Sequence, residues 1–235
     1  MSFGGLGSPS WEKGGGLLAT FVLIHGAGSD SWYWHLLAPK LRDQGHDVVM
    51  VDLPCDDDSA GLSEYADAVV GAIDDRTDLV VVAQSLAGFT APLVCARVDV
   101  ELLVLLNAMV PAPGESAGEW WANTGWVGKT PENENDYMEV FFHDVPPEVT
   151  AEAFDRGERA QSGTPFGQPW PLAAWPEVPT KVLIGRDDRF FSLEFQRRVA
   201  RQRLGITPDE IDGGHCVALS RPIELADRLM AYMSG

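Results

Sequence analysis

VVVAQSLAGF, residues 80–89, is an apolar, β-branched run that stops at a serine among small residues. We interpret it as a strand that turns sharply into a helix, with Ser85 at the apex. A serine on such a turn has a strained backbone, and the residues two places before and after it must be small because they face crowded neighbours. Ala83 and Ala87 meet this requirement, although the usual pattern, G-x-S-x-G, has glycine at both positions. The stretch predicts a nucleophilic serine; the open alternative is that Ser85 only caps the following helix.

Length, charge and cysteine content limit the classes of function. A chain of 235 residues suits one domain. The net charge of −18 argues against nucleic acid or an anionic membrane as partner, because both would repel the protein. The three cysteines show no C-x-x-C spacing, and no apolar run reaches the ~18 residues of a membrane span. We therefore expect a soluble, cytoplasmic protein that binds a small neutral molecule and needs no metal or cofactor. The sequence leaves open whether it forms a homodimer.

Apolar runs of strand length alternate with helical patterns over most of the chain. This alternation predicts right-handed βαβ units, and hence a single α/β domain over residues 19–235, with a doubly wound, mostly parallel sheet and helices on both faces. In such sheets the site lies at the carboxyl ends of the strands. Strands are predicted at 19–24, 48–51, 79–83, 102–106, 181–184 and 209–211, and helices at 32–44, 63–75, 86–97, 147–159, 193–203 and 222–233.

Two segments depart from the alternation. Residues 1–18, rich in Gly and Ser, are predicted to be a flexible tail. Residues 108–176 are predicted to be a lid insertion, because a loop this long between strands is seldom structureless. The aromatic residues favour an apolar substrate pocket, the alternative being a small satellite core. The candidate pocket residues are Trp32, Trp121, Trp126 and Phe142.

Acyl transfer by serine requires a base that accepts the hydroxyl proton. His215 follows two glycines in the loop after the last predicted strand, from which its ring can reach Ser85. We therefore expect His215 to be the base. His35 and His46 are expected to be structural or solvated, and His25 is expected to fix the geometry of its loop by hydrogen bonding. His143, in the insertion, is the alternative candidate for the base.

The base in turn needs a carboxylate that orients it. Asp187 and Asp188 lie in the turn after the predicted strand at 181–184. An acidic pair in a turn is by default a solvated feature or a helix cap. The chain order Ser, Asp, His is nevertheless the order that this architecture uses for its triad, and we expect Asp188 to be the acid.

Two backbone N–H groups are expected to bind the developing oxyanion. One belongs to Leu86, at the start of the helix after Ser85, where the helix dipole assists. The other belongs to Ala27, in the loop after the first predicted strand. This loop lacks the G-K-[ST] ending of a phosphate loop and the full glycine pattern of a dinucleotide site.

Taken together, these motifs resemble the α/β-hydrolase superfamily. His25-Gly26-Ala27 with Trp32-Tyr33-Trp34 is similar to the oxyanion loop of the branch that contains plant methylesterases and hydroxynitrile lyases. Gly185-Arg186-Asp187-Asp188 is similar to the acid turn, and Gly214-His215 to the histidine loop. The resemblance implies a core of about six strands. Cys216 stands where some hydroxynitrile lyases of this branch have a functional lysine, which favours the esterases.

The sequence thus predicts a serine hydrolase of carboxylesterase type, which cleaves a small, largely apolar carboxylic ester through an acyl-enzyme. Two alternatives stay open. One is a lyase or a cofactor-free peroxidase on the same fold. The other is a ligand-binding protein with a vestigial triad, because fold does not fix function.

Overall fold

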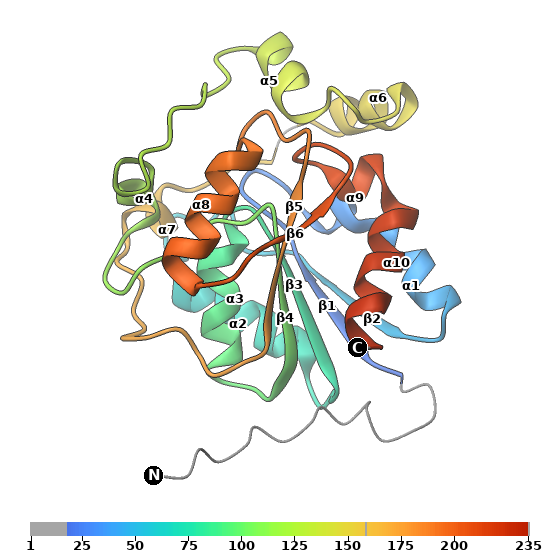
Figure 1. Ribbon diagram of the computed structural model, residues 1–235, viewed down its shortest axis with the longest axis vertical. Helices are drawn as coiled ribbons and strands as arrows, with labels where there is room; N and C mark the ends of the chain where they lie inside the picture. The colour runs from blue at the N-terminus through green and yellow to red at the C-terminus, as the bar shows by residue number, and fades with distance from the viewer. Residues whose placement is uncertain (1–17, 158, 235) are drawn as a thin grey trace.

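The computed structural model describes residues 18–157 and 159–234 (Figure 1). The predicted tail at residues 1–18 therefore lies outside the described residues, apart from residue 18. In the described part of the chain, no helix is both long and apolar enough to pass through a bilayer.

A single six-stranded sheet forms the centre of the molecule. Its strand order is β2-β1-β3-β4-β5-β6, and every neighbouring pair is parallel. The predicted fold class is confirmed, and each strand lies within two residues of its expected limits. For five of the strands the reason is that runs rich in Val, Leu and Ile mark strands covered on both faces, whereas the last strand has the sequence Asp-Glu-Ile. The strands are β1 (Thr20–Ile24), β2 (Asp47–Val51), β3 (Leu79–Gln84), β4 (Val100–Leu106), β5 (Thr180–Gly185) and β6 (Asp209–Ile211).

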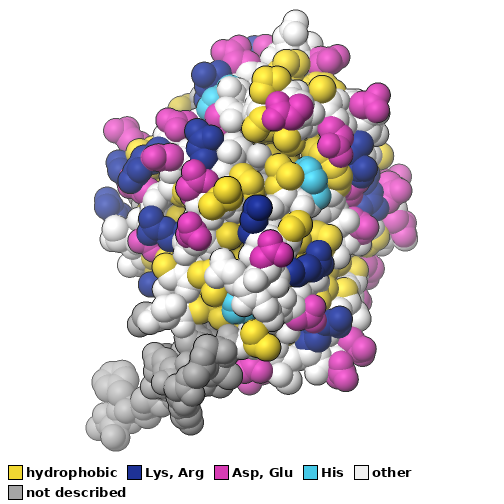
Figure 2. All heavy atoms as spheres, turned by 90° about the vertical axis from the view of Figure 1, so that its right-hand side faces the viewer, with side chains coloured by type: hydrophobic (Ala, Val, Ile, Leu, Met, Phe, Trp, Pro, Cys, Tyr) yellow, Lys and Arg dark blue, Asp and Glu magenta, His cyan; other side chains and the backbone are white. Residues whose placement is uncertain are grey.

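Helices cover both faces of the sheet and create two apolar layers. Alternate residues of each strand point to opposite faces. In β1, Val22 belongs to one layer, with α2 (Leu62–Ile73), α3 (Ala87–Cys95) and α8 (Leu193–Leu204). Leu23 belongs to the other, with α1 (Leu37–Asp43), α9 (Val217–Ser220) and α10 (Pro222–Met233). The outer surface seen in Figure 2 carries side chains of both charges, with many acidic ones, in keeping with the net charge of −18.

The helix predicted at residues 32–44 is wrong in its first half. The chain forms a 3-10 turn, η2 (Ser31–Trp34), in which the Asp30 carboxylate accepts the N–H of Trp32, and α1 starts only at Leu37. Pro39 explains the break. Proline has no N–H to donate, so it is tolerated in the first turn of a helix but not in its interior.

The segment between β4 and β5 crosses the carboxyl edge of the sheet (Figure 1). Only one of its helices was predicted, at 147–159, and that helix ends three residues early because Gly157 adopts a φ of 78°. Two others carry side-chain caps, from Ser116 and from Asn133. We name residues 107–179 the lid segment after the predicted insertion. Its helices are α4 (Ala117–Asn123), α5 (Glu134–Phe141), α6 (Pro147–Arg156) and α7 (Thr164–Gly167).

Candidate active site

Ser85 lies at the apex of the turn between β3 and α3. Its φ of 53° is in the left-handed region, which is strained for a serine. The Ser85 carbonyl accepts the N–H groups of Gly88 and Met109, at 3.1 and 3.0 Å. A Cβ on Gly88 would lie 1.8 Å from the carbonyl oxygen of Met109, so the helix can approach the neighbouring chain only with glycine there. Ser85 does not cap α3, because the capping position is Leu86 and no side chain fills it.

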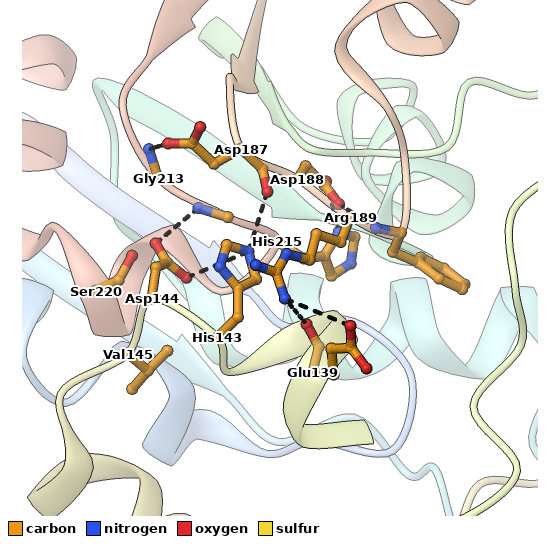
Figure 3. A network of polar contacts seen from close by, with 12 residues as sticks. Glu139, His143, Asp144, Val145, Asp187, Asp188, Arg189, Gly213, His215 and Ser220 are labelled. Atoms are coloured by element: carbon orange, nitrogen blue, oxygen red, sulfur yellow. Dashed lines mark hydrogen bonds and ion pairs between the residues drawn. The ribbon is translucent and has the colours of Figure 1, made fainter. Parts of the chain in front are cut away.

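The side chains of His215 and Asp188 contact each other (Figure 3). Nδ1 of His215 lies 2.8 Å from Oδ2 of Asp188, and both side chains are almost fully buried, at 5% and 0% exposed. The other carboxylate oxygen, Oδ1, accepts the backbone N–H groups of Phe190 and Phe191, at 2.8 and 2.9 Å. Because an ionised carboxylate only accepts, Nδ1 of His215 carries the proton and Nε2 is left as an acceptor. Asp187 instead accepts the N–H of Gly213, at 3.3 Å.

Two amide side chains join the histidine loop to the nucleophile turn. Gln84, directly before Ser85, donates from Nε2 to the carbonyl of His215 at 3.5 Å. Asn107 is fully buried at the end of β4, where its φ is 45°. Its Nδ2 donates to the carbonyls of Gly214 and His215, at 3.0 and 3.2 Å, and its Oδ1 accepts the N–H of Gly185 at 2.6 Å. Asn107 thus connects the loops that carry Asp188 and His215.

The loop after β1 lies against Ser85. A Cβ on Gly26 would come within 2.9 Å of the Ser85 Cβ. In the described part of the chain, neither the Ala27 nor the Leu86 N–H donates a hydrogen bond to a backbone carbonyl. The loop is held by His25, whose Nδ1 lies 2.8 Å from the carbonyl of Gly26 and whose Nε2 accepts the Leu53 N–H at 3.2 Å. Burial lowers the pKa of His25 and keeps its ring neutral, as this pair of bonds requires.

Three aromatic rings pack against the ring of His215. Phe141 of the lid and Phe190 and Phe191 of the acid turn have ring centroids 5.3, 5.4 and 5.3 Å from that of His215. Of the predicted pocket residues, Trp121 and Trp126 extend this cluster through Phe190.

The other two predicted pocket residues lie apart from this cluster. The Phe142 ring packs against Tyr137 and Phe154, so its neighbour Phe141 is the ring that meets His215. Trp32 stacks on His35 and donates to Glu152 of α6 at 2.9 Å. The structure therefore places Trp32 and Phe142 in contacts of the lid, not against His215.

Two further histidines and Cys216 have structural surroundings. Nδ1 of His46 accepts the N–H of Ala19 at 3.1 Å, and Nδ1 of His35 lies 2.8 Å from the carbonyl of Trp32. Cys216 is buried, which raises the pKa of its thiol and keeps it uncharged beside the histidine. Within 18–157 and 159–234, no three His, Cys, Asp or Glu side chains are arranged to hold a metal ion.

Comparison with known proteins identifies the family. The sequence profile of the alpha/beta hydrolase family matches residues 21–228, from β1 into α10. The chain belongs to the alpha/beta hydrolase family. The matched region contains Ser85, Asp188 and His215, and it includes the whole lid segment.

Individual relatives confirm the predicted resemblance to plant methylesterases. Methylesterase 18 of Arabidopsis thaliana is 31% identical over 110 residues, which are 40% of this chain and 40% of that protein. Norfluorocurarine synthase 1 of a Strychnos species is 28% identical over 103 residues, 39% of each chain. The chain thus matches about two fifths of the length of these curated relatives.

Solved structures share the fold over almost the whole chain. Polyneuridine aldehyde esterase superimposes with a TM-score of 0.77 at 19% identity, over 93% of this chain and 100% of that chain. A pyrethroid hydrolase from Sphingobium faniae JZ-2 superimposes with a TM-score of 0.76 at 21% identity, over 93% and 98%. This alpha/beta hydrolase therefore has the architecture of proteins named as esterases and hydrolases.

Proposed function

We propose that this alpha/beta hydrolase is a serine carboxylesterase that cleaves small, largely apolar esters through an acyl-enzyme. The observation that carries the proposal is the buried bond of 2.8 Å between His215 and Asp188, in a loop that Gln84 joins to the strained turn of Ser85. If His215 and Asp188 were only a structural ion pair, Ser85 would not need a strained backbone. If Ser85 only capped a helix, the buried pair of His215 and Asp188 would not be needed. Together they form the constellation of a nucleophile, its base and an orienting acid.

In the proposed acylation step, Ser85 Oγ attacks the carbonyl carbon of the ester while Nε2 of His215 accepts its proton. Asp188 keeps the proton of His215 on Nδ1 and stabilises the imidazolium that forms. The carbonyl oxygen becomes negative and accepts the N–H groups of Ala27 and Leu86, each contributing about 10²–10³ in rate. When the tetrahedral intermediate collapses, the alkoxide leaves as an alcohol with the proton from His215.

Deacylation repeats these steps with water as nucleophile. His215 accepts a proton from the water, whose oxygen attacks the acyl carbon, and the same two N–H groups bind the oxyanion. Collapse releases the carboxylic acid and returns the proton from His215 to Ser85 Oγ. The apolar substrate preference is supported by the aromatic rings around His215, which offer no charged partner to a substrate. The esterase names of several relatives support the choice of reaction.

Labelling with a fluorophosphonate probe tests this proposal. Such a probe phosphonylates a serine only when the serine is activated. We expect the wild type to label and Ser85→Ala to lose labelling, together with hydrolysis of a p-nitrophenyl ester series from acetate to decanoate. Ser220→Ala is the matched control, because Ser220 lies close to His215 in sequence and its buried hydroxyl has no partner in the described chain. A wild type that neither labels nor hydrolyses any ester of the series would refute the proposal and favour a lyase or a ligand-binding protein.

A further inference from the structure

Two adjacent residues of the lid contact the loops that carry the acid and the base. His143 and Asp144 follow α5 and point into these loops (Figure 3). Nε2 of His143 donates to the backbone carbonyl of Asp187 at 3.0 Å. Oδ2 of Asp144 accepts the backbone N–H of Gly214 at 2.8 Å. Each contact thus falls on the residue directly before a member of the candidate triad.

The packing around Gly214 shows how closely the pair is fitted. A Cβ at this position would lie 2.6 Å from Oδ1 of Asp144 and 2.8 Å from Nε2 of His143. Glycine at position 214 therefore leaves the space in which the side chains of His143 and Asp144 pack against the histidine loop. The two side chains are only 11% and 12% exposed. A largely buried carboxylate that accepts a backbone N–H makes a stronger bond than a neutral pair, because the bond is charge-assisted.

The same loops are also held from the side of the sheet. Asn107 binds Gly185 in the acid turn and the carbonyls of Gly214 and His215. The N–H of Gly214 thus faces the lid while its carbonyl faces the sheet. The His143–Asp144 pair supplies the second support of a loop whose position sets the direction of the His215 ring.

We propose that His143 and Asp144 form a positioning pair, through which the docked lid holds Asp188 and His215 in their reactive arrangement. This inference rests on the proposed hydrolase function. It assigns to the lid segment a part in the chemical step. Catalysis depends on such placement, since a misplacement of ~1 Å lowers rates by about 100-fold.

A second lid contact serves as the internal control. Arg189 donates to the backbone carbonyl of Glu139 at 3.1 Å and lies 3.9 Å from its carboxylate. These side chains are 50% and 74% exposed, so the ion pair is weak and screened. Glu139→Gln therefore changes the attachment of the lid without touching the residues before Asp188 and His215.

The kinetic test compares kcat and KM for p-nitrophenyl acetate, which has the smallest acyl group of the ester series. Asp144→Ala and His143→Phe are expected to lower kcat about 10- to 100-fold with KM within about threefold of the wild type. Asp144→Asn and His143→Gln retain an acceptor and a donor, and are expected to restore kcat to within about threefold. Glu139→Gln is expected to match the wild type. A rise in KM with unchanged kcat would show that the pair only anchors the lid, and would overturn the inference.

A second measurement does not depend on turnover. The His215 Nδ1–H proton in its bond to Asp188 gives a low-field proton resonance, which is expected in the wild type and in Ser85→Ala. We expect Asp144→Ala and His143→Phe to broaden or shift it while circular dichroism shows a folded chain, and Asp144→Asn to restore it. An unchanged resonance in Asp144→Ala would refute the positioning role even if no ester is ever found. Absence of ester turnover with a resonance sensitive to Asp144 would instead refute only the hydrolase function.

Discussion

Substitution of Gly26 by alanine tests whether the loop after β1 provides an oxyanion donor. The added Cβ would lie 2.9 Å from the Ser85 Cβ, whereas ordinary contacts begin at 3.4 Å, so the loop and the serine must separate by about 0.5 Å (3.4 − 2.9). It would also lie 2.4 Å from Oε1 of Gln84, whose amide donates to the carbonyl of His215. A misplacement of ~1 Å lowers reaction rates about 100-fold, and this shift is about half as large. Complete loss of one oxyanion donor lowers kcat about 10²–10³-fold. We therefore expect kcat/KM of Gly26→Ala to fall about 10- to 100-fold. Overpacking is expected to cost about 1–3 kcal/mol of stability.

The assay measures kcat/KM for p-nitrophenyl esters and the rate of inactivation by a fluorophosphonate, with thermal unfolding followed by circular dichroism. Gly71→Ala is the matched control. It makes the same change inside α2, where a Cβ meets nothing within 4 Å. Alanine there is expected to stabilise the helix by about 0.5–1 kcal/mol and to leave kcat/KM unchanged. If Gly26→Ala retains the wild-type kcat/KM, Ala27 does not donate to the oxyanion and the placement of this part of the site is wrong.

Three further outcomes are expected. Asp188→Asn should lower kcat by about 10⁴, because an amide in place of the carboxylate favours the wrong tautomer of His215; a loss below about tenfold would contradict the assignment. Glu115 and Arg203 form an ion pair whose side chains are only 4% and 15% exposed. Burial alone would raise the pKa of Glu115, but its bonds with Arg203 and neighbouring groups lower the pKa below 4.5, so its contribution to the free energy of unfolding is present above pH 4.5 and disappears as pH falls through the lowered pKa. Glu115→Gln should cost about 3–5 kcal/mol in urea unfolding at pH 7 and flatten this acid dependence. Burial lowers the pKa of His25 below 6.5 in the folded protein. As pH falls below 6.5, the unfolded chain therefore binds a proton at this histidine before the folded protein does, and the free energy of unfolding should decline. The decline between about pH 7.5 and 5.5 should be smaller in His25→Gln.

The fold could be predicted from the sequence because its strands are buried on both faces. A run such as residues 79–83 is apolar throughout, and alternation with helices then requires a parallel sheet. The lid was harder to predict, because its helices are short and its aromatic residues follow no single period. Ser116 and Glu119 form a capping box, a signal that could have located α4.

For the candidate site, chain order and the strand ends were informative, and they led to Ser85, Asp188 and His215. The supporting residues were not foreseen. The sequence motifs assign no role to Asn107, which holds the carbonyl of Gly214, or to Asp144, which accepts the N–H of Gly214. Both act on backbone groups of distant loops, and such contacts leave no spacing pattern in the sequence. Their partners become evident only when β4, the lid and the histidine loop are assembled.

The strand order has a consequence for synthesis. Strands β5 and β6 are the last in the chain, and they add successively to one edge of the sheet beside β4. Chains emerge from the ribosome with the N-terminal part first, so the part of the sheet that bears Ser85 is available before the loops that bear Asp188 and His215. A nascent chain that stops within the lid contains the serine without its base and acid. Its hydroxyl is then an ordinary alcohol, and the reactive arrangement arises only when the final edge of the sheet is in place.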